Sequence, residues 1–358
     1  MPWIFWSNVM QKIAANVIEP FVAEIFRAAG SDTVEAATIA AHLVEASLMG
    51  HDSHGLLRIP KYIDWVRAGE VVANQHVQVI TDRGPLLVID GNFGYGQVIG
   101  KEAMEIASMR AHTHGMAAVA IRNSGHLGRI GAWPELLARS GLASFHFVNT
   151  SGYGILVTPH GGSNRRFSAN PIAAGVPIAG GDPLILDIAT SAIAEGKIQL
   201  ALNKGEMLPV GMLIDGHGRP TCDPAAFYAE PPGAILPFGG HKGSGLSFFC
   251  EIFAGSLSGG FASNPQSSTA NRLVNNMLSL VFEPDAFGNP EAFAEDVCRF
   301  VNWSKTASPI TPDGLVFLPG EIERETFAER LANGLPIDDE TWKKIIATAA
   351  VLGVTAPT

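Results

Sequence analysis

The chain has 358 residues, of which 47% are hydrophobic and 16% charged, a composition that excludes an intrinsically disordered protein. Its formal net charge is −10, and no long basic run is present, which argues against a nucleic-acid partner. The three cysteines lie far apart with no Cys-x-x-Cys pair, which favours a reducing compartment over a disulfide framework or a cysteine-based metal site. At about 150 residues per domain, this length predicts two domains.

The N-terminal segment resembles neither an export signal nor a membrane anchor. It lacks the basic region, apolar core and cleavage site of a secretory peptide. Lys12, Glu19 and Glu24 interrupt the apolar segment that follows. We therefore expect a cytoplasmic protein with no membrane partner.

The first part of the chain is predicted to be mainly helical. Asp32 and Glu35 are a plausible capping pair for one helix, and Gly50 is a plausible stop. Between them, apolar residues recur at helical spacing: Ala37, Ala41, Val44 and Leu48. Pro60 begins a further helical pattern.

From residue 86 the pattern alternates between strand and helix. The predicted strands cover 86–91, 116–122 and 142–150, and the predicted helices cover 96–115 and 128–141. This alternation indicates an α/β domain, for which we take 81–289, with approximate boundaries. Residues 1–80 and 290–358 would together form a mainly helical domain, so that the two domains are interleaved.

One glycine-rich motif is similar to a dinucleotide-binding fingerprint. GYGQVIG (94–100) lies between a predicted strand and a predicted helix, but its spacing is one residue longer than the common form. The following strand should end in an acid, and it ends in Arg122-Asn123 instead. We interpret these glycines as a tight strand-to-helix turn and do not predict a Rossmann fold.

Two histidine segments are candidates for proton transfer. In HDSHG (51–55), a histidine at a helix end can exchange a proton near neutral pH, although this pair could also cap a helix or bind zinc. In NSGHLGR (123–129), a histidine follows the carboxyl end of a predicted strand, where open α/β sheets bind ligands. The next helix and Arg129 could hold an anion there.

A third candidate segment is PFGGHKGSG (237–245), in which glycines surround His241 and Lys242 and precede a predicted helix. This arrangement suits a phosphate or a carboxylate, or it is a structural turn before a buried helix. Asp187 and Glu321 could each cap a helix or contact a ribose. The motifs thus make a hydride-transfer enzyme plausible without requiring one.

Taken together, several segments in this order resemble the malate/L-lactate dehydrogenase family, whose nucleotide-binding domain is not a Rossmann fold: GHDSHG (50–55), NSGHLGRIGAW (123–133), LDIATSAIAEGK (186–197), GHKGSGLSFFCEIFAGSLSGG (240–260) and LPGE (318–321). The similarity is greatest to the hydroxycarboxylate dehydrogenases of this family. The resemblance implies an NAD(P)-dependent oxidoreductase for 2-hydroxy and 2-oxo acids. It also implies a homodimer in which a non-Rossmann α/β domain is combined with a helical domain.

The resemblance also implies roles for particular residues. His126 matches the family's acid/base, and His54 matches a residue assigned to proton donation or to cofactor contact. The implied cofactor-binding residues are His54, Gly128, Arg129, Ile130, Ile185, Leu186, Asp187, Ile188, Ala189, His241, Asn275, Gly320, Glu321, Ile322 and Glu323. We add Arg58 and Lys242 as candidate groups for the substrate carboxylate. NAD is the expected cofactor, NADP remains open, and no metal is expected.

Three alternatives remain open from the sequence. A reductase of cyclic imino acids, of the piperideine-2-carboxylate type, would use the same fold and histidines, so that only a substrate panel separates it. A metal-dependent lyase or hydrolase would use His51, His54 and His126 and would lose activity with a chelator. A non-catalytic binding protein would bind nucleotide without turnover.

Overall fold

The structure is a computed structural model that describes residues 11–266, 272–311 and 314–357. The chain divides into unit 1, Met1–Asn74 with Glu321–Thr358, and unit 2, Gln75–Gly320. Residues 290–358 were expected to belong to the helical domain, whereas α9 (Pro290–Lys305) belongs to unit 2. It follows the last strand of the unit 2 sheet after a single short turn. Residues 1–10 of the expected helical domain lie outside the described residues.

Unit 1 is mainly helical, as predicted. Its elements are β1 (Gln11–Ile13), α1 (Ala15–Ala28), α2 (Thr33–Leu48), the short 3₁₀ turns η1 (Asp52–His54) and η2 (Leu56–Arg58), α3 (Ile59–Arg67), α10 (Glu321–Asn333), β12 (Leu335–Ile337) and α11 (Asp339–Val351). β1 and β12 pair antiparallel, so residues near both ends of the chain share one small sheet. The rings of Phe21 and Trp342 make an edge-to-face contact, with centroids 6.0 Å apart, that stabilises the core of unit 1.

The predicted capping of α2 is present in one direction only. The Asp32 side chain accepts a 2.8 Å hydrogen bond from the amide of Glu35. The Asp32 amide, which a capping box would pair with Glu35, donates to the Asn74 side chain at 2.7 Å. The Glu35 carboxylate accepts hydrogen bonds from the Ser31 hydroxyl at 2.6 Å and from the Asn74 amide at 2.9 Å. The helix ends before Gly50, as expected.

The apolar face that the helical spacing defines on α2 is only partly buried. Val44 and Leu48 are buried, but Ala37 and Ala41 are exposed. The helix instead buries a face that includes Ile39 and Leu43. These side chains remove more apolar area from water than alanines do, so they decide which face turns inward.

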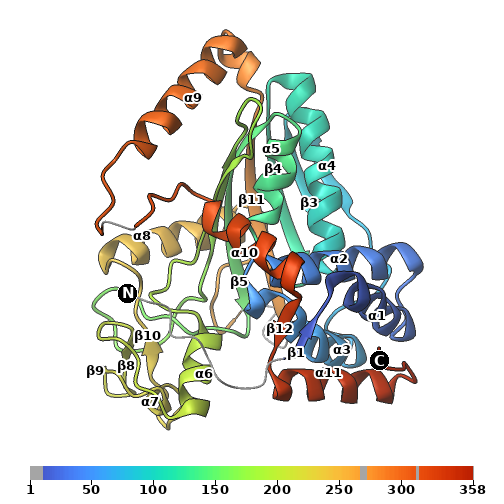
Figure 1. Cartoon of the computed structure of the whole chain (residues 1–358), viewed down its shortest axis with the longest axis vertical. Helices are drawn as coiled ribbons and strands as arrows, with labels where there is room; N and C mark the ends of the chain where they lie inside the picture. The colour runs from blue at the N-terminus through green and yellow to red at the C-terminus, as the bar shows by residue number, and fades with distance from the viewer. Residues whose placement is uncertain (1–10, 267–271, 312–313, 358) are drawn as a thin grey trace. The chain divides into compact units, whose positions relative to one another are not determined.

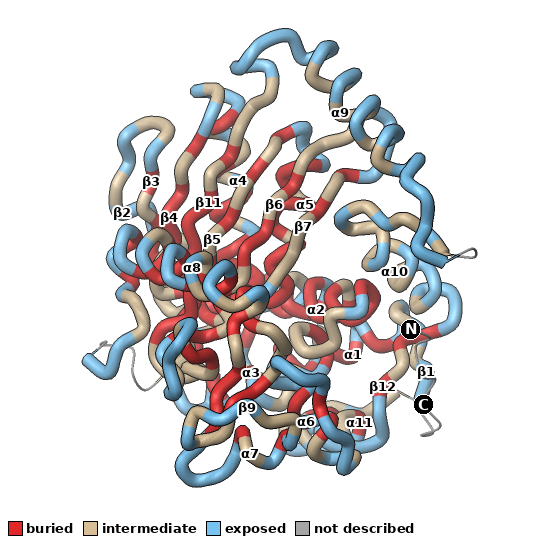
Figure 2. Tube along the Cα trace, turned by 90° about the vertical axis from the view of Figure 1, so that its left-hand side faces the viewer, coloured by how far each residue is buried: buried red, intermediate tan, exposed pale blue. Residues whose placement is uncertain are grey.

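Unit 2 contains a seven-stranded mixed sheet in the order β2-β3-β4-β11-β5-β6-β7. The strands are β2 (Gln78–Arg83), β3 (Leu86–Asp90), β4 (Met116–Ser124), β5 (Ala143–Gly152), β6 (Ile172–Val176), β7 (Leu184–Ile188) and β11 (Leu273–Phe282). The helices and short turns are α4 (Gly96–His114), α5 (Ala132–Arg139), α6 (Glu195–Lys204), α7 (Ala225–Tyr228), α8 (His241–Cys250), the π-helical turn η3 (Glu251–Ser256), η4 (Pro284–Phe287) and α9. A separate small sheet has the order β10-β8-β9, formed by β8 (Leu213–Ile214), β9 (Pro220–Thr221) and β10 (Ala234–Ile235). Figure 2 shows the large sheet with buried residues concentrated in its central strands.

The three predicted strands and the helix between the first two are present, but the sheet is not purely parallel. β3 and β4 are parallel neighbours, whereas β11 lies between β4 and β5 and is antiparallel to both. The segment 273–282 was not predicted as a strand. The helix predicted over 128–141 begins later, at Ala132, because the preceding residues form a turn.

The two faces of the large sheet carry different layers. α4 and α5 pack on one face, where Ile99 and Leu137 share a buried apolar cluster with Val148 of β5 (Figure 1). Side chains alternate along a strand, so Phe147 points to the opposite face. There its ring contacts Phe253 of η3, with centroids 5.2 Å apart. In the described segments, every helix is too short or too polar to span a bilayer.

Candidate active site

His126 lies in a short loop directly after β4, and the main chain on both sides of it is held in place. The Gly125 amide donates to the Gly94 carbonyl at 2.8 Å, and the Leu127 amide donates to the Asn275 side chain at 2.9 Å. The carbonyl of His126 itself accepts a 3.3 Å hydrogen bond from Gln97. The His126 residue is half-buried within this fixed loop.

The glycine motif at 94–100 supports this loop by allowing close approach. A Cβ at Gly96 would lie 2.2 Å from the carbonyl oxygen of His126, and a Cβ at Gly100 would lie 2.4 Å from the Trp133 ring. No larger residue fits at either position without moving one of these neighbours. The motif therefore packs the first turns of α4 against the His126 loop and α5, in agreement with its interpretation as structural glycines.

The turn after His126 is anchored by a buried ion pair. Arg129 is 3% exposed and contacts Glu135 of α5 at 2.9 Å, and the more exposed Arg139 contacts the other oxygen of the same carboxylate at 2.7 Å. Burial raises the pKa of Glu135, but the two arginines outweigh it and hold that pKa below its ordinary value. The Arg129 guanidinium, expected to hold an anion, is thus engaged by the protein itself.

The end of β7 joins two of the sequence-predicted segments. Asp187 accepts a 2.7 Å hydrogen bond from the Gly131 amide, which ties β7 to the turn that begins at Gly128. At the other end of the predicted stretch, the Ile185 amide donates to the Pro319 carbonyl at 3.2 Å. The structure therefore brings the 128–131 turn, the 185–189 strand end and the segment before Gly320 together.

The start of α8 lies beside the chain that follows β7. The Phe238 amide donates to the Thr190 carbonyl at 3.0 Å, and the rings of His160 and His241 have centroids 6.0 Å apart. A cavity of about 450 Å³ opens here. Its lining includes His160, Ala192, Met212, Leu236, Phe238 and Gly240. His241 and Lys242 are exposed at the N-terminus of the helix.

The histidine segment of unit 1 is fixed against α2 and α10. Arg330 pairs with Asp52 at 2.6 and 3.1 Å, and His51 lies 3.7 Å from Glu323. Arg58 donates to the Ser53 carbonyl at 2.6 Å. The structure thus brings His51, Arg58 and Glu323 to the surroundings of His54.

His54 has an unusual protonation equilibrium. Its pKa is lowered to about 3, first by burial and then by the electrostatic effects of Arg58, His51 and His42. Although the residue as a whole is partly exposed, its Nδ1 is buried. His54 is therefore neutral at physiological pH. Within the described residues, no group of three His, Cys, Asp or Glu side chains is arranged to hold a metal ion.

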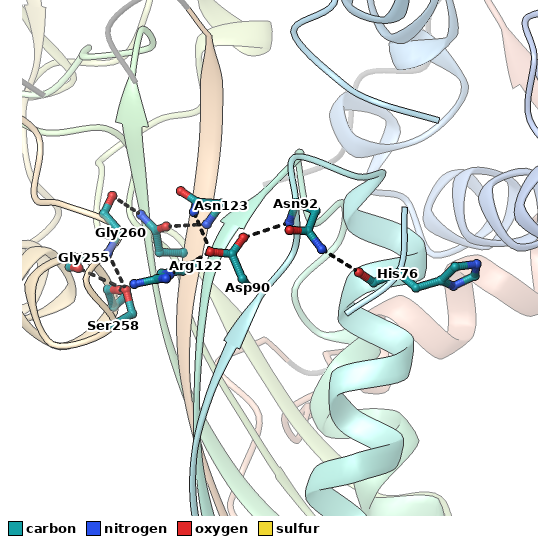
Figure 3. Close-up of polar contacts among 10 residues, drawn as sticks. His76, Asp90, Asn92, Arg122, Asn123, Gly255, Ser258 and Gly260 are labelled. Carbon is teal, nitrogen blue, oxygen red and sulfur yellow. Dashed lines mark hydrogen bonds and ion pairs between the residues drawn. The ribbon is translucent and has the colours of Figure 1, made fainter. Parts of the chain in front are cut away.

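The parallel strands β3 and β4 end in a polar cluster that the sequence analysis missed. Asp90 accepts hydrogen bonds from Arg122 at 2.8 Å, from the Asn123 side chain at 2.9 Å and from the Asn92 amide at 2.9 Å (Figure 3). The arginine found in place of the Rossmann acid thus pairs with an acid of the neighbouring strand. The available signal was Asp90 at the end of an apolar strand.

A family model described as malate/L-lactate dehydrogenase matches residues 13–346. The chain belongs to the malate/L-lactate dehydrogenase family. It is 40% identical to hydroxycarboxylate dehydrogenase B of Escherichia coli strain K12, over 95% of this chain and 94% of that protein. This family membership confirms the resemblance found in the sequence.

Solved structures of the malate/L-lactate dehydrogenase family share the fold. The sulfolactate dehydrogenase of Methanocaldococcus jannaschii is 30% identical with a TM-score of 0.87, covering 97% of this chain and 98% of that one. The Δ1-piperideine-2-carboxylate reductase of Pseudomonas syringae pv. tomato is also 30% identical, with a TM-score of 0.80, covering 95% and 100%. The predicted α/β class, without a Rossmann arrangement, is therefore confirmed.

Proposed function

We propose that this chain is a nicotinamide-dependent oxidoreductase that interconverts a 2-hydroxy acid and its 2-oxo acid. The observation that carries the proposal is His126, which follows a strand end and lies between two main-chain amides held by hydrogen bonds. A histidine held in this way can transfer a proton from a fixed position. Membership of the malate/L-lactate dehydrogenase family supports the choice of reaction.

His126 is the better candidate of the two histidines for the acid–base role. The pKa of His54, about 3, makes it a weak base near pH 7, and its protonated form is scarce there. His54 is therefore a neutral imidazole within unit 1. In the direction of reduction, His126 delivers a proton to the oxygen at C2. In oxidation, it accepts the hydroxyl proton.

Arg58 is our candidate for holding the substrate carboxylate. Arg58 is among the groups that lower the pKa of His54, which indicates that the electrostatic potential at the His54 ring is positive. An anion bound beside Arg58 would relieve that potential, and a guanidinium matches the geometry of a carboxylate. Lys242, at the N-terminus of α8, is the second candidate.

The residues of unit 2 also fit a nicotinamide cofactor, either NAD or NADP. The cavity beside α8 has the size of a small-molecule site, and its apolar lining suits a planar ring. The positive end of the α8 dipole, together with the exposed Lys242, suits a phosphate. His241, Asp187 and the turn at Gly128 would contribute to holding it. When bound, the cofactor supplies or accepts the hydride at C2.

A second candidate function is reduction of a cyclic imino acid. The relative from Pseudomonas syringae, of the same fold, is named a Δ1-piperideine-2-carboxylate reductase. Its substrate presents a C=N bond beside a carboxylate where a 2-oxo acid presents C=O. The same acid and the same carboxylate-binding groups would serve both substrates.

The deciding experiment follows absorbance at 340 nm with NADH and then NADPH. Pyruvate, oxaloacetate, phenylpyruvate and piperideine-2-carboxylate are the substrates to compare. We expect oxidation of one cofactor by an oxo acid. Preference for piperideine-2-carboxylate would support the second function. Failure to bind either cofactor would contradict the proposal.

We also propose that the chain forms a homodimer through apolar surface of unit 2. α9 has no buried residue, and it exposes Phe300 and Trp303 by 62% and 71%. Phe248 and Phe249 of α8 are also more than half exposed. Apolar patches of this kind mark protein–protein contacts. Light scattering should give twice the chain mass, and a monomer at micromolar concentration would contradict this proposal.

A further inference from the structure

A buried carboxylate on the face of the sheet opposite α4 has no part in the proposed chemistry. Glu251, the first residue of the π-helical turn η3, is only 5% exposed. Its oxygens accept hydrogen bonds from the side chains of Asn149 at 2.9 Å and Asn170 at 2.7 Å. Ser263 adds its amide at 2.8 Å and its hydroxyl at 3.0 Å. A buried charge is costly, so a carboxylate held by so many donors calls for an explanation.

This carboxylate fixes the direction of a chain of hydrogen bonds. The Glu251 oxygen that Asn149 contacts also accepts the Ser263 amide, so this oxygen is an acceptor and Asn149 must turn its NH₂ group toward it. The Asn149 oxygen then faces the NH₂ group of Asn276, which donates to it at 2.9 Å. The Asn276 oxygen is thereby turned toward the amide of Asn123, from which it accepts at 3.1 Å.

The chain of hydrogen bonds ends at the loop that carries His126. Asn123 lies near the end of β4, just before this loop, and Leu127 ends the loop with a 2.9 Å hydrogen bond to Asn275. The neighbouring asparagines of β11 therefore hold the loop at both ends. Successive strand residues normally point to opposite faces of a sheet. The register of β11 against β4 shifts between Asn275 and Met277, and this irregularity accompanies the contact of both asparagines with the same segment.

Asn276 is also fixed from other directions. It is fully buried, and its NH₂ group lies 3.1 Å from the Gly260 carbonyl and 3.4 Å from the Ser151 hydroxyl. The Gly260 carbonyl and the Asn149 oxygen can only accept, so a flipped amide would lose both hydrogen bonds. The amide of Asn123 is thus opposite an acceptor whose orientation the protein dictates.

We propose that Asn276, oriented through Asn149 by Glu251, is a positioning residue for His126. The inference rests on the proposed function, because it assumes that His126 transfers the proton. Asn276 does not touch the substrate. It keeps the start of the loop in the position from which the histidine acts. A displacement of about 1 Å at such a group can cost on the order of 10²-fold in rate.

The first test uses the full chain without cofactor, so it does not depend on activity. Hydrogen exchange of the peptide covering 121–130 is compared between wild type, Asn276→Ala and Ser263→Ala. Ser263 contacts the same carboxylate but lies outside the path to the loop, so it is the matched control. We expect about tenfold faster exchange in Asn276→Ala only. Unchanged exchange in that variant would overturn the inference.

The second test is a double-mutant cycle on kcat with the most active substrate of the panel. Asn276→Ala should lower kcat by about ten- to a hundredfold in the wild-type background and have no further effect in His126→Ala. The Kd for NADH should stay unchanged in both. An equal loss in both backgrounds would overturn the positioning role while leaving the proposed function intact. Full turnover by His126→Ala would instead contradict the acid–base assignment.

A milder variant keeps the inference testable if Asn276→Ala does not fold. Glu251→Gln preserves the shape but removes the charge of a carboxylate, so the hydrogen bonds that orient the asparagine side chains become weaker. We expect faster exchange of the 121–130 peptide and a kcat lowered about three- to tenfold. Wild-type exchange together with wild-type kcat would overturn the role of Glu251.

Discussion

The amide of Leu127 donates a 2.9 Å hydrogen bond to Oδ1 of Asn275, a residue 148 positions further along the chain. The other end of the Asn275 amide donates to the Thr150 hydroxyl at 3.0 Å. This side chain is 4% exposed and uses both of its polar atoms within the protein. The resemblance had suggested a cofactor contact for Asn275. The observed bonds support a role in holding the His126 loop.

Replacement of His126 is expected to remove the acid–base contribution while leaving the fold intact. We expect His126→Ala to lower kcat by about 10²–10⁴-fold, with little change in the Kd for NADH. The matched control is His114→Ala, because His114 is exposed at the end of α4. Steady-state kinetics and fluorescence titration with NADH measure the two quantities. A variant with full turnover would refute the assignment.

Replacement of Gly96 tests whether the glycine motif supports the same loop. An alanine in a helix is normally more stable than a glycine, by up to about 1 kcal/mol. At Gly96, however, the new Cβ would lie 2.2 Å from the His126 carbonyl, so the loop must move. We expect Gly96→Ala to lower kcat by about 10²-fold.

The control for this prediction is the same change where space is open. A Cβ at Gly245 of α8 meets no atom within 4 Å. Gly245→Ala should keep or exceed the wild-type Tm, whereas Gly96→Ala should lower it. Wild-type kcat in Gly96→Ala would show that the loop tolerates displacement.

Buried histidines predict a loss of stability in acid. His146 is fully buried between the Ser144 and Ser279 hydroxyls, at 2.9 and 2.8 Å. Burial lowers its pKa to about 3 in the folded state, from 6.5 for an ordinary histidine. The unfolded chain therefore binds the proton first. The contribution of His146 is fully present above pH 6.5 and is lost as the pH falls toward 3.

The expected slope is about 1.4 kcal/mol per pH unit for each such histidine. Urea unfolding between pH 7.5 and 4.5 measures it. His146→Gln should make the pH dependence shallower, although His54 shares the lowered pKa and keeps part of it. His114→Gln, at an exposed position, should reproduce the wild-type slope. Equal slopes for His146→Gln and wild type would contradict this prediction.

The buried Arg129–Glu135 pair predicts a strong asymmetry between single and double substitutions. Glu135→Gln leaves an uncompensated buried guanidinium and should cost about 3–5 kcal/mol of unfolding free energy. The double variant Arg129→Met/Glu135→Leu should recover at least half of that loss. Arg139→Ala should cost less than about 1 kcal/mol, because that side chain is 59% exposed. Equal stability of the single and double variants would argue against the pairing.

Features of the fold with a local cause could be predicted from the sequence. The strand at 116–122 and the helix at 96–115 are continuous patterns with a glycine at the helix end, and both are present. His126 could be placed at a strand end for the same reason. The identity of the family followed from motifs in a fixed order.

Features that depend on distant partners could not be predicted. β11 contains Asn275 and Asn276 within an apolar segment, a pattern that indicates buried polar groups without naming their partners. Glu251 gave no signal, because a lone glutamate in a helix is usually exposed. The ion pair of Arg129 was missed because Glu135 lies on the next helix, where it resembles a surface charge.

The insertion of β11 between β4 and β5 has a consequence for biosynthesis. The ribosome releases β4 and β5 well before residues 273–282, yet neither of these strands has its central neighbour until then. The nascent sheet therefore consists of two parts with unpaired edges, which are prone to pairing with other chains. A chaperone that covers these edges during elongation would raise the yield of folded protein. Premature termination before residue 273 would leave an aggregation-prone fragment.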